Sequence, residues 1–312
     1  GILMGGGAGR ILAQWIVDGV PDVDITEVDI ARMMPFENTP SYVKDRAVEL
    51  LGFMFDIGYP NKHFQTARMA RRSAFHDRLA AAGAHFGVYA GWEYPEWFAP
   101  EGVEPQAEYT WKRPSWFEYS AEEHRAARES VSLLDYSVMG KILVQGRDAE
   151  EVLNRICANN VAVPIGRCVY TQWLNERGGI EADLTVTRLA EDQFLILTAD
   201  RTIRAVQAWL RRHTPQDAHL CATNITSAYS VLNVQGPNSR DLLSRVTSAD
   251  MSNEAFPFLT MQEIDIGYAL VKAIRVTYVG ELGWELYIPT EFSLHVFDIL
   301  MEAGAEFGPV SY

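Results

Sequence analysis

Three features are scarce in this 312-residue sequence: cysteine, long apolar runs and clustered positive charge. Its three cysteines, Cys157, Cys168 and Cys221, form no C-x-x-C pair, which argues against a zinc ribbon or a disulfide framework and favours a reducing compartment. Apolar stretches such as residues 10–20 are interrupted by polar side chains and fall short of a bilayer span of about 20 residues. We therefore expect no membrane-spanning segment and a cytoplasmic or mitochondrial matrix location.

Positive charge is the third scarcity. The formal net charge is −14 and the sequence pI is near 5.0, so the chain repels phosphate backbones, and no run of Lys and Arg forms a local basic track. Nucleic acid is thus an unexpected partner, while the oligomeric state stays open. His213 and His219 lack a third ligand nearby and are interpreted as surface residues, so we expect no metal.

Glycine is concentrated at the beginning of the chain. The cluster at residues 5–9 precedes apolar residues at helical spacing, which predicts a glycine loop that leads into a helix N-terminus. Such a loop can present backbone N–H groups to an electronegative ligand atom. Because Arg10 replaces the third glycine of a G-x-G-x-x-G pattern, the motif alone favours a structural role. With glycines at its start and no initiator Met, the sequence is expected to be a piece of a longer protein.

The next hundred residues alternate between weak and clear patterns. Residues 21–40 are predicted to be an extended connector, and Ser41 is predicted to cap a helix that begins at Tyr42 and ends near Phe55. Residues 61–79 are rich in Arg and Lys, which we interpret as a solvated face packed against an acidic neighbouring domain rather than a dedicated anion site. Residues 91–116 have little periodicity and read as an ordered linker.

Beyond Ser120 the sequence predicts helices and strands in alternation. The intervals between them do not repeat as βαβ units, which indicates an α+β fold with largely antiparallel sheets. Helices are expected at residues 121–130, 148–157, 201–212, 239–246 and 293–304, and strands at 141–145, 169–174, 184–188, 193–198, 230–234, 273–278 and 284–288.

Two acidic segments bounded by glycines are candidates for chemistry. In the first, residues 170–187 read as a strand, a Gly-Gly turn and a second strand. The period of two places Glu181, Asp183, Thr185 and Thr187 on one polar face of the second strand. From spacing alone, a solvent-exposed strand face is the favoured interpretation.

The second segment, residues 275–288, reads as a hairpin with Gly280 and Gly283 in its turn. The turn would bring Tyr278 and Glu285 together across the hairpin. A carboxylate beside aromatic rings suits a flat heterocycle with adjacent N–H donors, because its two oxygens can accept two parallel hydrogen bonds. An ordinary hairpin with a surface Glu285 is an equal alternative.

At these two segments, and at Val234–Pro237 with Ser239 and Arg240, the sequence resembles the glycine-cleavage T-protein family of tetrahydrofolate-dependent aminomethyltransferases. Upstream, residues 6–19 resemble the last helix of an amine-oxidising flavin domain. Residues 64–68 and 73–79 resemble the segment that joins that domain to the folate part in dimethylglycine and sarcosine dehydrogenases and oxidases. The order of the blocks matches, so the resemblance extends over nearly the whole chain.

The resemblance implies an α+β, T-protein-like folate-binding domain with antiparallel sheets and flanking helices. Residues 1–32 would be a remnant of the flavin domain, residues 33–115 a connecting domain and linker, and residues 116–312 the folate domain. In the family the folate domain continues beyond Tyr312.

The same resemblance implies a role for particular residues. Asp183 would be the catalytic carboxylate beside the reacting nitrogen of folate, although Ala182 stands where many T-proteins have a second acid, and Glu181 is the less favoured substitute. Glu285 would hold the pteridine ring. The remaining implied contacts are Tyr170, Tyr278 and Arg275 to folate, and Gly6, Gly7 and Gly9 at the edge of the flavin site of the parent enzyme.

The function implied is that of the folate half of a flavin-dependent N-methyl amino acid dehydrogenase or oxidase. FAD in the intact parent would oxidise the N-methyl group, and tetrahydrofolate would capture the resulting iminium carbon as 5,10-methylenetetrahydrofolate. Alternatives are a stand-alone aminomethyltransferase, a folate-dependent demethylase of another substrate class, and a non-catalytic scaffold for the flavin domain. The sequence names neither the amine nor the electron acceptor.

Overall fold

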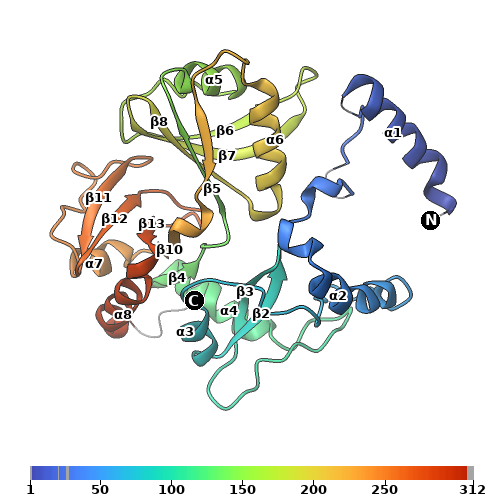
Figure 1. The fold of residues 1–312 in the computed structure, drawn as a ribbon. Helices are drawn as coiled ribbons and strands as arrows, with labels where there is room; N and C mark the ends of the chain where they lie inside the picture. The colour runs from blue at the N-terminus through green and yellow to red at the C-terminus, as the bar shows by residue number, and fades with distance from the viewer. Residues whose placement is uncertain (1, 20, 26–27, 308–312) are drawn as a thin grey trace.

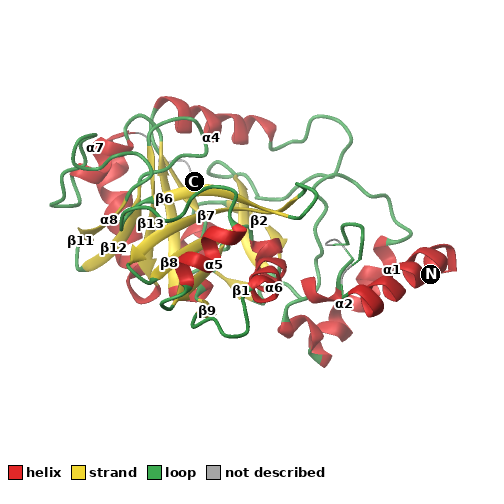
Figure 2. Ribbon diagram, turned by 90° about the horizontal axis from the view of Figure 1, so that it is seen from above, coloured by secondary structure: helices red, strands yellow, loops and turns green. Residues whose placement is uncertain are grey.

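The computed structural model describes residues 2–19, 21–25 and 28–307, with the side chain of Ala31 left out (Figure 1). Two five-stranded sheets and a smaller three-stranded sheet form the body of the molecule. The helices α1 and α2 extend from one side of it (Figure 2). Within the described ranges, no helix combines the length and the apolar character needed to cross a membrane.

The N-terminal segment is more helical than the sequence suggested. Helix α1 spans Gly5–Asp18, so the glycines at its start are helical and do not form the expected loop. A short 3-10 helix at Ile2–Met4 precedes α1, and two more at Ile30–Arg32 and Pro35–Asn38 interrupt the segment that was expected to be extended.

Helix α2 spans Pro40–Phe53, and Thr39 caps it by accepting a hydrogen bond from the Tyr42 amide. Ser41 is therefore not the cap. Pro40 suits the first helical position, because its missing N–H would have no partner there and its φ is already helical. The predicted apolar face of this helix is largely exposed, with Leu51 59% and Met54 70% accessible.

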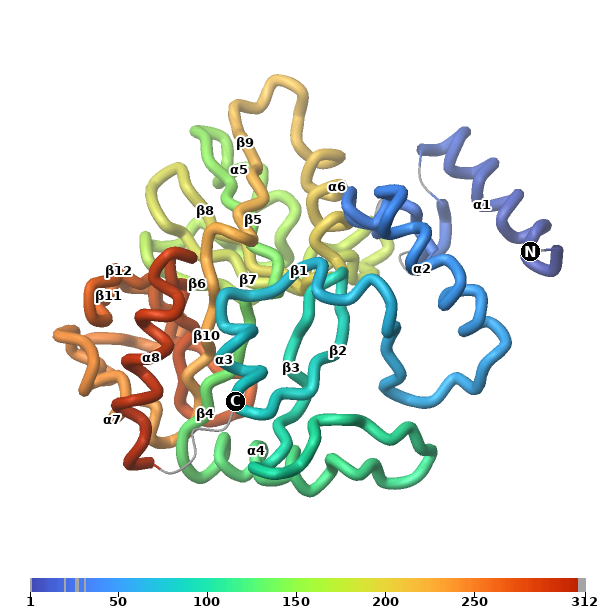
Figure 3. Tube along the Cα trace, turned by 60° about the horizontal axis from the view of Figure 1, so that its bottom comes forward, coloured from blue at the N-terminus to red at the C-terminus, as the bar shows by residue number. Residues whose placement is uncertain are grey.

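Four of the five basic residues in the segment that follows pair with acids of this same chain, which corrects their interpretation as a face for an acidic neighbour. The exception is Arg71, which donates to the Ala90 carbonyl. Arg68 forms a forked ion pair with Glu93, a carboxylate that is only 2% exposed. Arg78 of helix α3 (His76–Ala81) pairs with Asp298 at 2.9 Å, which ties α3 to the C-terminal helix (Figure 3).

The aromatic-rich segment is a β-hairpin in its first part, so the linker prediction was wrong for those residues. Strand β2 (Ala84–Tyr89) pairs antiparallel with β3 (Trp92–Phe98), and β1 (Arg71–Arg72) lies parallel to β3. Ala90 and Gly91 both have positive φ, as a two-residue hairpin turn of the primed type requires. The strands were missed because a bulge breaks the alternation and Pro95 lies within β3.

One five-stranded sheet, hereafter the upper sheet, has the strand order β6-β7-β8-β5-β9. Helices α5 (Ala149–Ile156) and α6 (Ile203–His213) pack on its outer face around the fully buried Trp173. The 3-10 helix Asp200–Thr202 precedes α6. The strands are β5 (Gly140–Gln145), β6 (Cys168–Leu174), β7 (Ile180–Ala190), β8 (Gln193–Thr198) and β9 (Cys221–Asn224).

The other five-stranded sheet, hereafter the lower sheet, has the order β11-β12-β13-β10-β4. Its outer face packs against α3, α7 (Ser239–Ser244) and α8 (Ser293–Gly304). Its strands are β4 (Ser132–Asp135), β10 (Tyr229–Gln235), β11 (Met261–Ile266), β12 (Ala269–Ile274) and β13 (Gly283–Pro289). The remaining elements are helix α4 (Phe117–Glu129) and short 3-10 helices at Thr226–Ala228, Thr290–Phe292 and Ala305–Phe307.

Most predicted elements of this region are present, and the α+β fold with antiparallel sheets is confirmed. The main error is the strand predicted at residues 273–278: β12 ends at Ile274, and residues 275–282 form the connection to β13. Strands β4, β9 and β11 were not predicted. Cys168, Val231 and Tyr287 belong to one core cluster, so the inner faces of the two sheets pack against each other.

Candidate functional site

The inner faces of the two sheets carry three of the predicted site residues: Asp183, Tyr170 and Glu285. On β7, Asp183, Thr185 and Thr187 pair with Gln172, Tyr170 and Cys168 of β6, which places all six side chains on one face of the upper sheet. Cys168 packs against the lower sheet, so this face is the inner one. On the lower sheet, Glu285 and Tyr287 alternate with the outward-facing Trp284 and Leu286.

The polar face of β7 runs from solvent into the interior. Asp183 is exposed, whereas Thr185 and Thr187 are 8% and 1% exposed. The interpretation of the whole face as solvent-exposed was therefore wrong for the two threonines. Asp183 therefore lies at the solvent-exposed end, or rim, of a row of polar side chains that continues inward through Thr185 and Thr187, hereafter the polar strip.

Asp183 and Tyr170 form a pair. The Tyr170 hydroxyl donates to the Asp183 Oδ2 over 2.9 Å, and this hydrogen bond to the carboxylate raises the pKa of Tyr170. Glu181 is also exposed, but its Oε1 accepts a hydrogen bond from the Asn175 side chain at 2.8 Å. Of the two acids, Asp183 is the one with a tyrosine hydroxyl beside it.

Glu285 lies inside the protein and is only 2% exposed, which excludes the surface-hairpin alternative. The Tyr287 hydroxyl donates to its Oε2 over 2.7 Å, while its buried Oε1 has no hydrogen-bond partner among the described residues. Burial raises the pKa of Glu285 to about 7, against the opposing effects of the Tyr287 and Tyr278 hydroxyls and of the Lys141 charge. A buried acceptor without a partner is costly, and it suits a ligand that brings an N–H donor.

Tyr278 lies in the connection between β12 and β13, and its ring stacks against Tyr136 with centroids 6.0 Å apart. The Tyr278 side chain is 53% exposed, and its pKa is raised by its partial burial and by the Glu285 charge. The structure therefore brings Tyr278 and Glu285 together, as expected. It also adds Tyr136, which the sequence analysis missed because a single tyrosine after a short strand carries no distinguishing pattern.

Arg275 is placed elsewhere. Its guanidinium donates to the Phe256 carbonyl and to the Asn253 side chain, each over 2.7 Å, and lies over Trp284. Trp284 belongs to the outer face of the lower sheet, opposite to Glu285. Arg275 is thus not among the residues that surround Glu285.

Lys141 is a second residue that the sequence did not reveal. It lies on the inner face of β5 and has no solvent exposure. Burial lowers the pKa of its ammonium to about 7, while the charges of Asp135 and Glu285 act in the opposite direction. A lysine in an apolar strand pattern gives no signal that its charge is buried.

The glycines assigned to the flavin edge do not form a cradle within this chain. Gly6, Gly7 and Gly9 lie in α1, which has no buried residue, and a Cβ added at any of them would meet no atom within 4 Å. These residues therefore do not fit a flavin by themselves. Their assignment to the edge of a flavin site stays a prediction.

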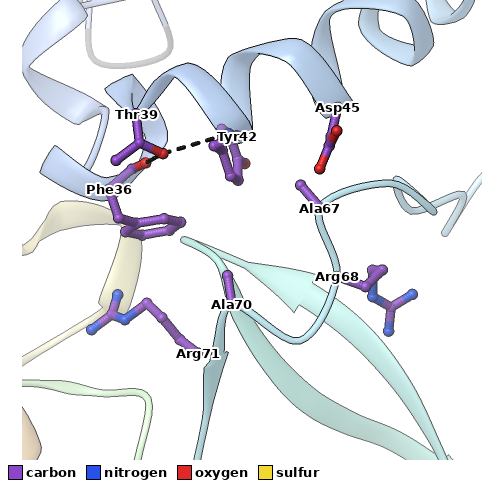
Figure 4. Close-up of a pocket in the computed structure, with 8 residues that line it drawn as sticks. All are labelled: Phe36, Thr39, Tyr42, Asp45, Ala67, Arg68, Ala70 and Arg71. Carbon is purple, nitrogen blue, oxygen red and sulfur yellow. Dashed lines mark hydrogen bonds between the residues drawn. The ribbon is translucent and has the colours of Figure 1, made fainter.

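A surface pocket of about 440 Å³ lies between α2 and the residues before β1, away from these groups (Figure 4). Arg68 and Arg71 contribute to it, but their side chains diverge, and each is engaged: Arg68 with Glu93, and Arg71 with the Ala90 carbonyl and the Trp92 ring. None of the predicted site residues lines it.

Comparison with known proteins assigns both ends of the chain. Residues 75–312 match the family model of the GCVT N-terminal domain, and residues 18–73 match that of the FAD dependent oxidoreductase central domain. The two matches meet near Phe75, within the segment we assigned to the connecting domain. Phe75 and Leu79 belong to the core of the lower sheet, so α3 packs with the later residues.

Individual relatives cover nearly all of the chain. It is 39% identical to "4-methylaminobutanoate oxidase (formaldehyde-forming)" of Paenarthrobacter nicotinovorans over 99% of this chain and 37% of that protein. It is 34% identical to the mitochondrial pyruvate dehydrogenase phosphatase regulatory subunit of Mus musculus, over 99% of this chain and 36% of that protein. It is 33% identical to mouse mitochondrial dimethylglycine dehydrogenase, over 99% of this chain and 35% of that protein. The chain thus spans little more than a third of the length of these relatives.

The fold has a counterpart among solved structures. The glycine cleavage system aminomethyltransferase T from Bartonella henselae superposes with a TM-score of 0.60 at 25% identity, covering 74% of this chain and 57% of that one. The family match, the relatives and this structure agree with the resemblance seen in the motifs. The chain therefore belongs to the GCVT N-terminal domain family, preceded by residues of an FAD dependent oxidoreductase central domain.

Proposed function

We propose that this chain is the tetrahydrofolate-binding, one-carbon-accepting part of an FAD-dependent dehydrogenase or oxidase of N-methyl amino acids. The observation that carries the proposal is Glu285, a buried carboxylate with one oxygen held by Tyr287 and the other without a partner in the part of the chain that the structure describes. When bound, tetrahydrofolate supplies a nucleophilic amine that takes up a one-carbon unit as 5,10-methylenetetrahydrofolate.

Glu285 has the chemistry needed to recognise the pteridine. Its unpartnered Oε1 can accept an N–H from the heterocycle, and hydrogen bonds to a charged group contribute about 1.5–3 kcal/mol each. Tyr278 and Tyr136 lie beside it and offer ring faces to a flat ligand. Arg275 has no part in this proposal, because its guanidinium is on the other face of the sheet.

Asp183 is suited to a different task. It is exposed at the rim of the polar strip, where its carboxylate can take a proton from a reacting amine and balance the charge of an iminium carbon. Its partner Tyr170 donates to Oδ2 and holds the carboxylate in place. General base catalysis of this kind contributes roughly 10²–10⁴-fold.

The wider context of the protein is part of the proposal. Relatives named as oxidases and dehydrogenases of methylated amino acids support an N-methyl amino acid as the source of the carbon. A cytoplasmic or mitochondrial matrix location agrees with the mitochondrial designation of the mouse dehydrogenase. The described residues of α1 offer no cradle for the flavin, so the oxidation step lies outside this proposal.

A second candidate is a scaffold that has lost catalysis. The relative named as a regulatory subunit of pyruvate dehydrogenase phosphatase favours it, because it matches this chain over the same length as the enzymes do. The presence of Asp183 and the unpartnered Glu285 oxygen weighs against this candidate.

Calorimetric titration with 5-formyltetrahydrofolate, a stable reduced folate, distinguishes the two. The folate proposal expects saturable binding that Glu285→Gln abolishes, since an amide presents an N–H donor where the carboxylate presents only acceptors. The matched control is Glu263→Gln, on β11 of the same sheet, where the carboxylate is half-exposed and paired with Lys272. Absence of binding by the unaltered protein would favour the scaffold.

A further inference from the structure

Lys141 is an unusual residue for the centre of a protein. It has no solvent exposure, and its ammonium donates to three backbone carbonyls: Ser137 and Met139 at 3.0 Å, and Thr226 at 3.3 Å. Within the described ranges it has no carboxylate at ion-pair distance. Burying an ammonium is costly unless its donors are satisfied, and here all three are.

Two of those carbonyls belong to the turn that carries Tyr136. The Met139 amide donates to the Tyr136 carbonyl over 3.0 Å, and the Tyr136 amide donates to Val231 of β10 over 2.9 Å. The Lys141 ammonium holds the same turn together by donating to the Ser137 and Met139 carbonyls. Because the Tyr136 ring stacks on Tyr278, the position of this turn determines one wall around Glu285.

The charge of Lys141 also reaches Glu285. Three titratable groups act on Glu285, and each lowers its pKa. They are Tyr287, whose hydroxyl donates to the carboxylate, Tyr278, and the positive charge of Lys141. Burial raises the pKa values of Tyr136 and Cys168, and the Glu285 charge raises them further. Lys141 itself faces Glu285 and Asp135, and Asp135 is held by the Ser137 amide and the Ser73 hydroxyl.

We propose that Lys141 is a positioning residue for the one-carbon acceptor: its ammonium fixes the Tyr136–Met139 turn and, while it is protonated, adds a positive charge that favours the ionised form of Glu285. The ionised carboxylate then presents two acceptor oxygens to a heterocycle with adjacent N–H donors. The inference rests on the proposed role of Glu285. In this inference Lys141 contacts no ligand, and it acts on the site through the position of the turn and through its charge on Glu285.

The two roles of Lys141 can be separated by Lys141→Gln. Glutamine retains amide donors for the carbonyls of the turn but has no charge. The matched control is Lys272→Gln, a lysine on the inner side of β12 that pairs with Glu263 at the surface and does not act on Glu285. Isotope-edited infrared titration reports the ionisation of Glu285, identified as the band that disappears in Glu285→Gln.

In Lys141→Gln the ionisation midpoint of Glu285 should move to higher pH by about one unit, since the buried carboxylate loses a positive charge that lowers its pKa. Lys272→Gln should leave the midpoint unchanged. An unchanged midpoint in Lys141→Gln would overturn the inference. This measurement needs no folate, so it decides the role of Lys141 even if the protein proves not to bind folate and the proposed function fails.

The affinity for 5-formyltetrahydrofolate should follow the same midpoint. In the unaltered protein, binding weakens as the pH falls and Glu285 takes up a proton. In Lys141→Gln this weakening begins at higher pH, so a shift of one unit from about 7 should lower the affinity near pH 7.5 about threefold, with recovery near pH 9. A loss that is the same at every pH would mean that only the turn matters, and would contradict the charge role.

A reciprocal measurement covers the case in which Lys141→Gln does not fold. Coupling between two ionisable groups is mutual, so Glu285→Gln should lower the pKa of Lys141. Nitrogen-15 NMR of the lysine side chains reads this value directly. A Lys141 pKa that is the same in Glu285→Gln and in the unaltered protein would show that the two charges are not coupled.

Discussion

Glu285 and Asp183 are both carboxylates on the inner faces of the two sheets, but they differ in their surroundings. Glu285 is buried among tyrosine hydroxyls, and Asp183 stands in solvent beside a single tyrosine. A buried carboxylate is suited to recognition because water does not compete for its hydrogen bonds, whereas a solvated carboxylate can exchange protons. At the scale of single residues, mutations should therefore separate binding from chemistry.

Glu285→Ala should weaken folate binding more than Tyr278→Phe. The first change removes a charged acceptor of hydrogen bonds worth about 1.5–3 kcal/mol each, while the second retains the ring that faces the ligand. Calorimetric titration of both variants measures the order. If Tyr278→Phe proves the more damaging, the phenol hydroxyl rather than the carboxylate is the main contact.

Asp183→Asn should retain folate affinity within a few-fold and lose transfer of the carbon. Asparagine preserves shape but cannot take a proton or balance a cation, a loss of about 3–5 kcal/mol if both roles are real. The measurement is the partition of product between formaldehyde and methylenetetrahydrofolate in the oxidising enzyme that contains this chain. Efficient transfer by Asp183→Asn would point to Glu181 instead.

At the scale of elements, the ease of prediction followed how each segment is buried. Helix α8 was predicted with its observed bounds because it buries one stripe, which includes Val296, Phe297 and Leu300, and exposes the other. Strand β3 was missed because Pro95 and a bulge obscure its pattern. The strand predicted at 273–278 was misplaced because the apolar alternation continues into the connection after Ile274, where no neighbouring strand pairs with it.

The stripe on α8 allows a stability prediction. Leu300 is fully buried in the core of the lower sheet, so Leu300→Ala should lower the free energy of unfolding by about 2–5 kcal/mol. Leu294→Ala on the same helix is the control, because Leu294 is 43% exposed and its loss should cost far less. Urea denaturation of both variants checks this; similar midpoints would mean that α8 is not packed as described.

At the scale of the whole molecule, the buried carboxyl makes stability depend on pH. The pKa of Glu285 is about 7 in the folded protein, above its ordinary value of 4.5. A raised carboxyl pKa stabilises the fold at low pH, and this contribution is lost as the pH rises from about 4.5 to about 7.

Glu285→Gln lacks this dependence. Relative to the unaltered protein, it should therefore gain stability over that pH window by a difference on the order of 3 kcal/mol. Thermal unfolding of both proteins at several pH values measures the difference. A constant difference across the window would show that Glu285 titrates at its ordinary value.

The 312-residue chain should also be colourless. The glycines of α1 are exposed and helical, and no group around them forms a cradle for a flavin within the described residues. Purification followed by an absorption spectrum tests this. A stoichiometric flavin spectrum would contradict the expectation and would require another site in the chain.

The sequence by itself determined the family, the antiparallel α+β fold and the candidates Asp183 and Glu285, because short motifs with glycine turns and period-two strands are local in the chain. Only the tertiary structure decided which candidates share a site. Strand alternation and sheet packing placed Arg275 opposite to Glu285, and they buried Thr187 and Lys141 on the inner side. Burial on the inner side depends on packing between the two sheets, as of Cys168 against Tyr287, which lie more than a hundred positions apart, and no local pattern encodes it.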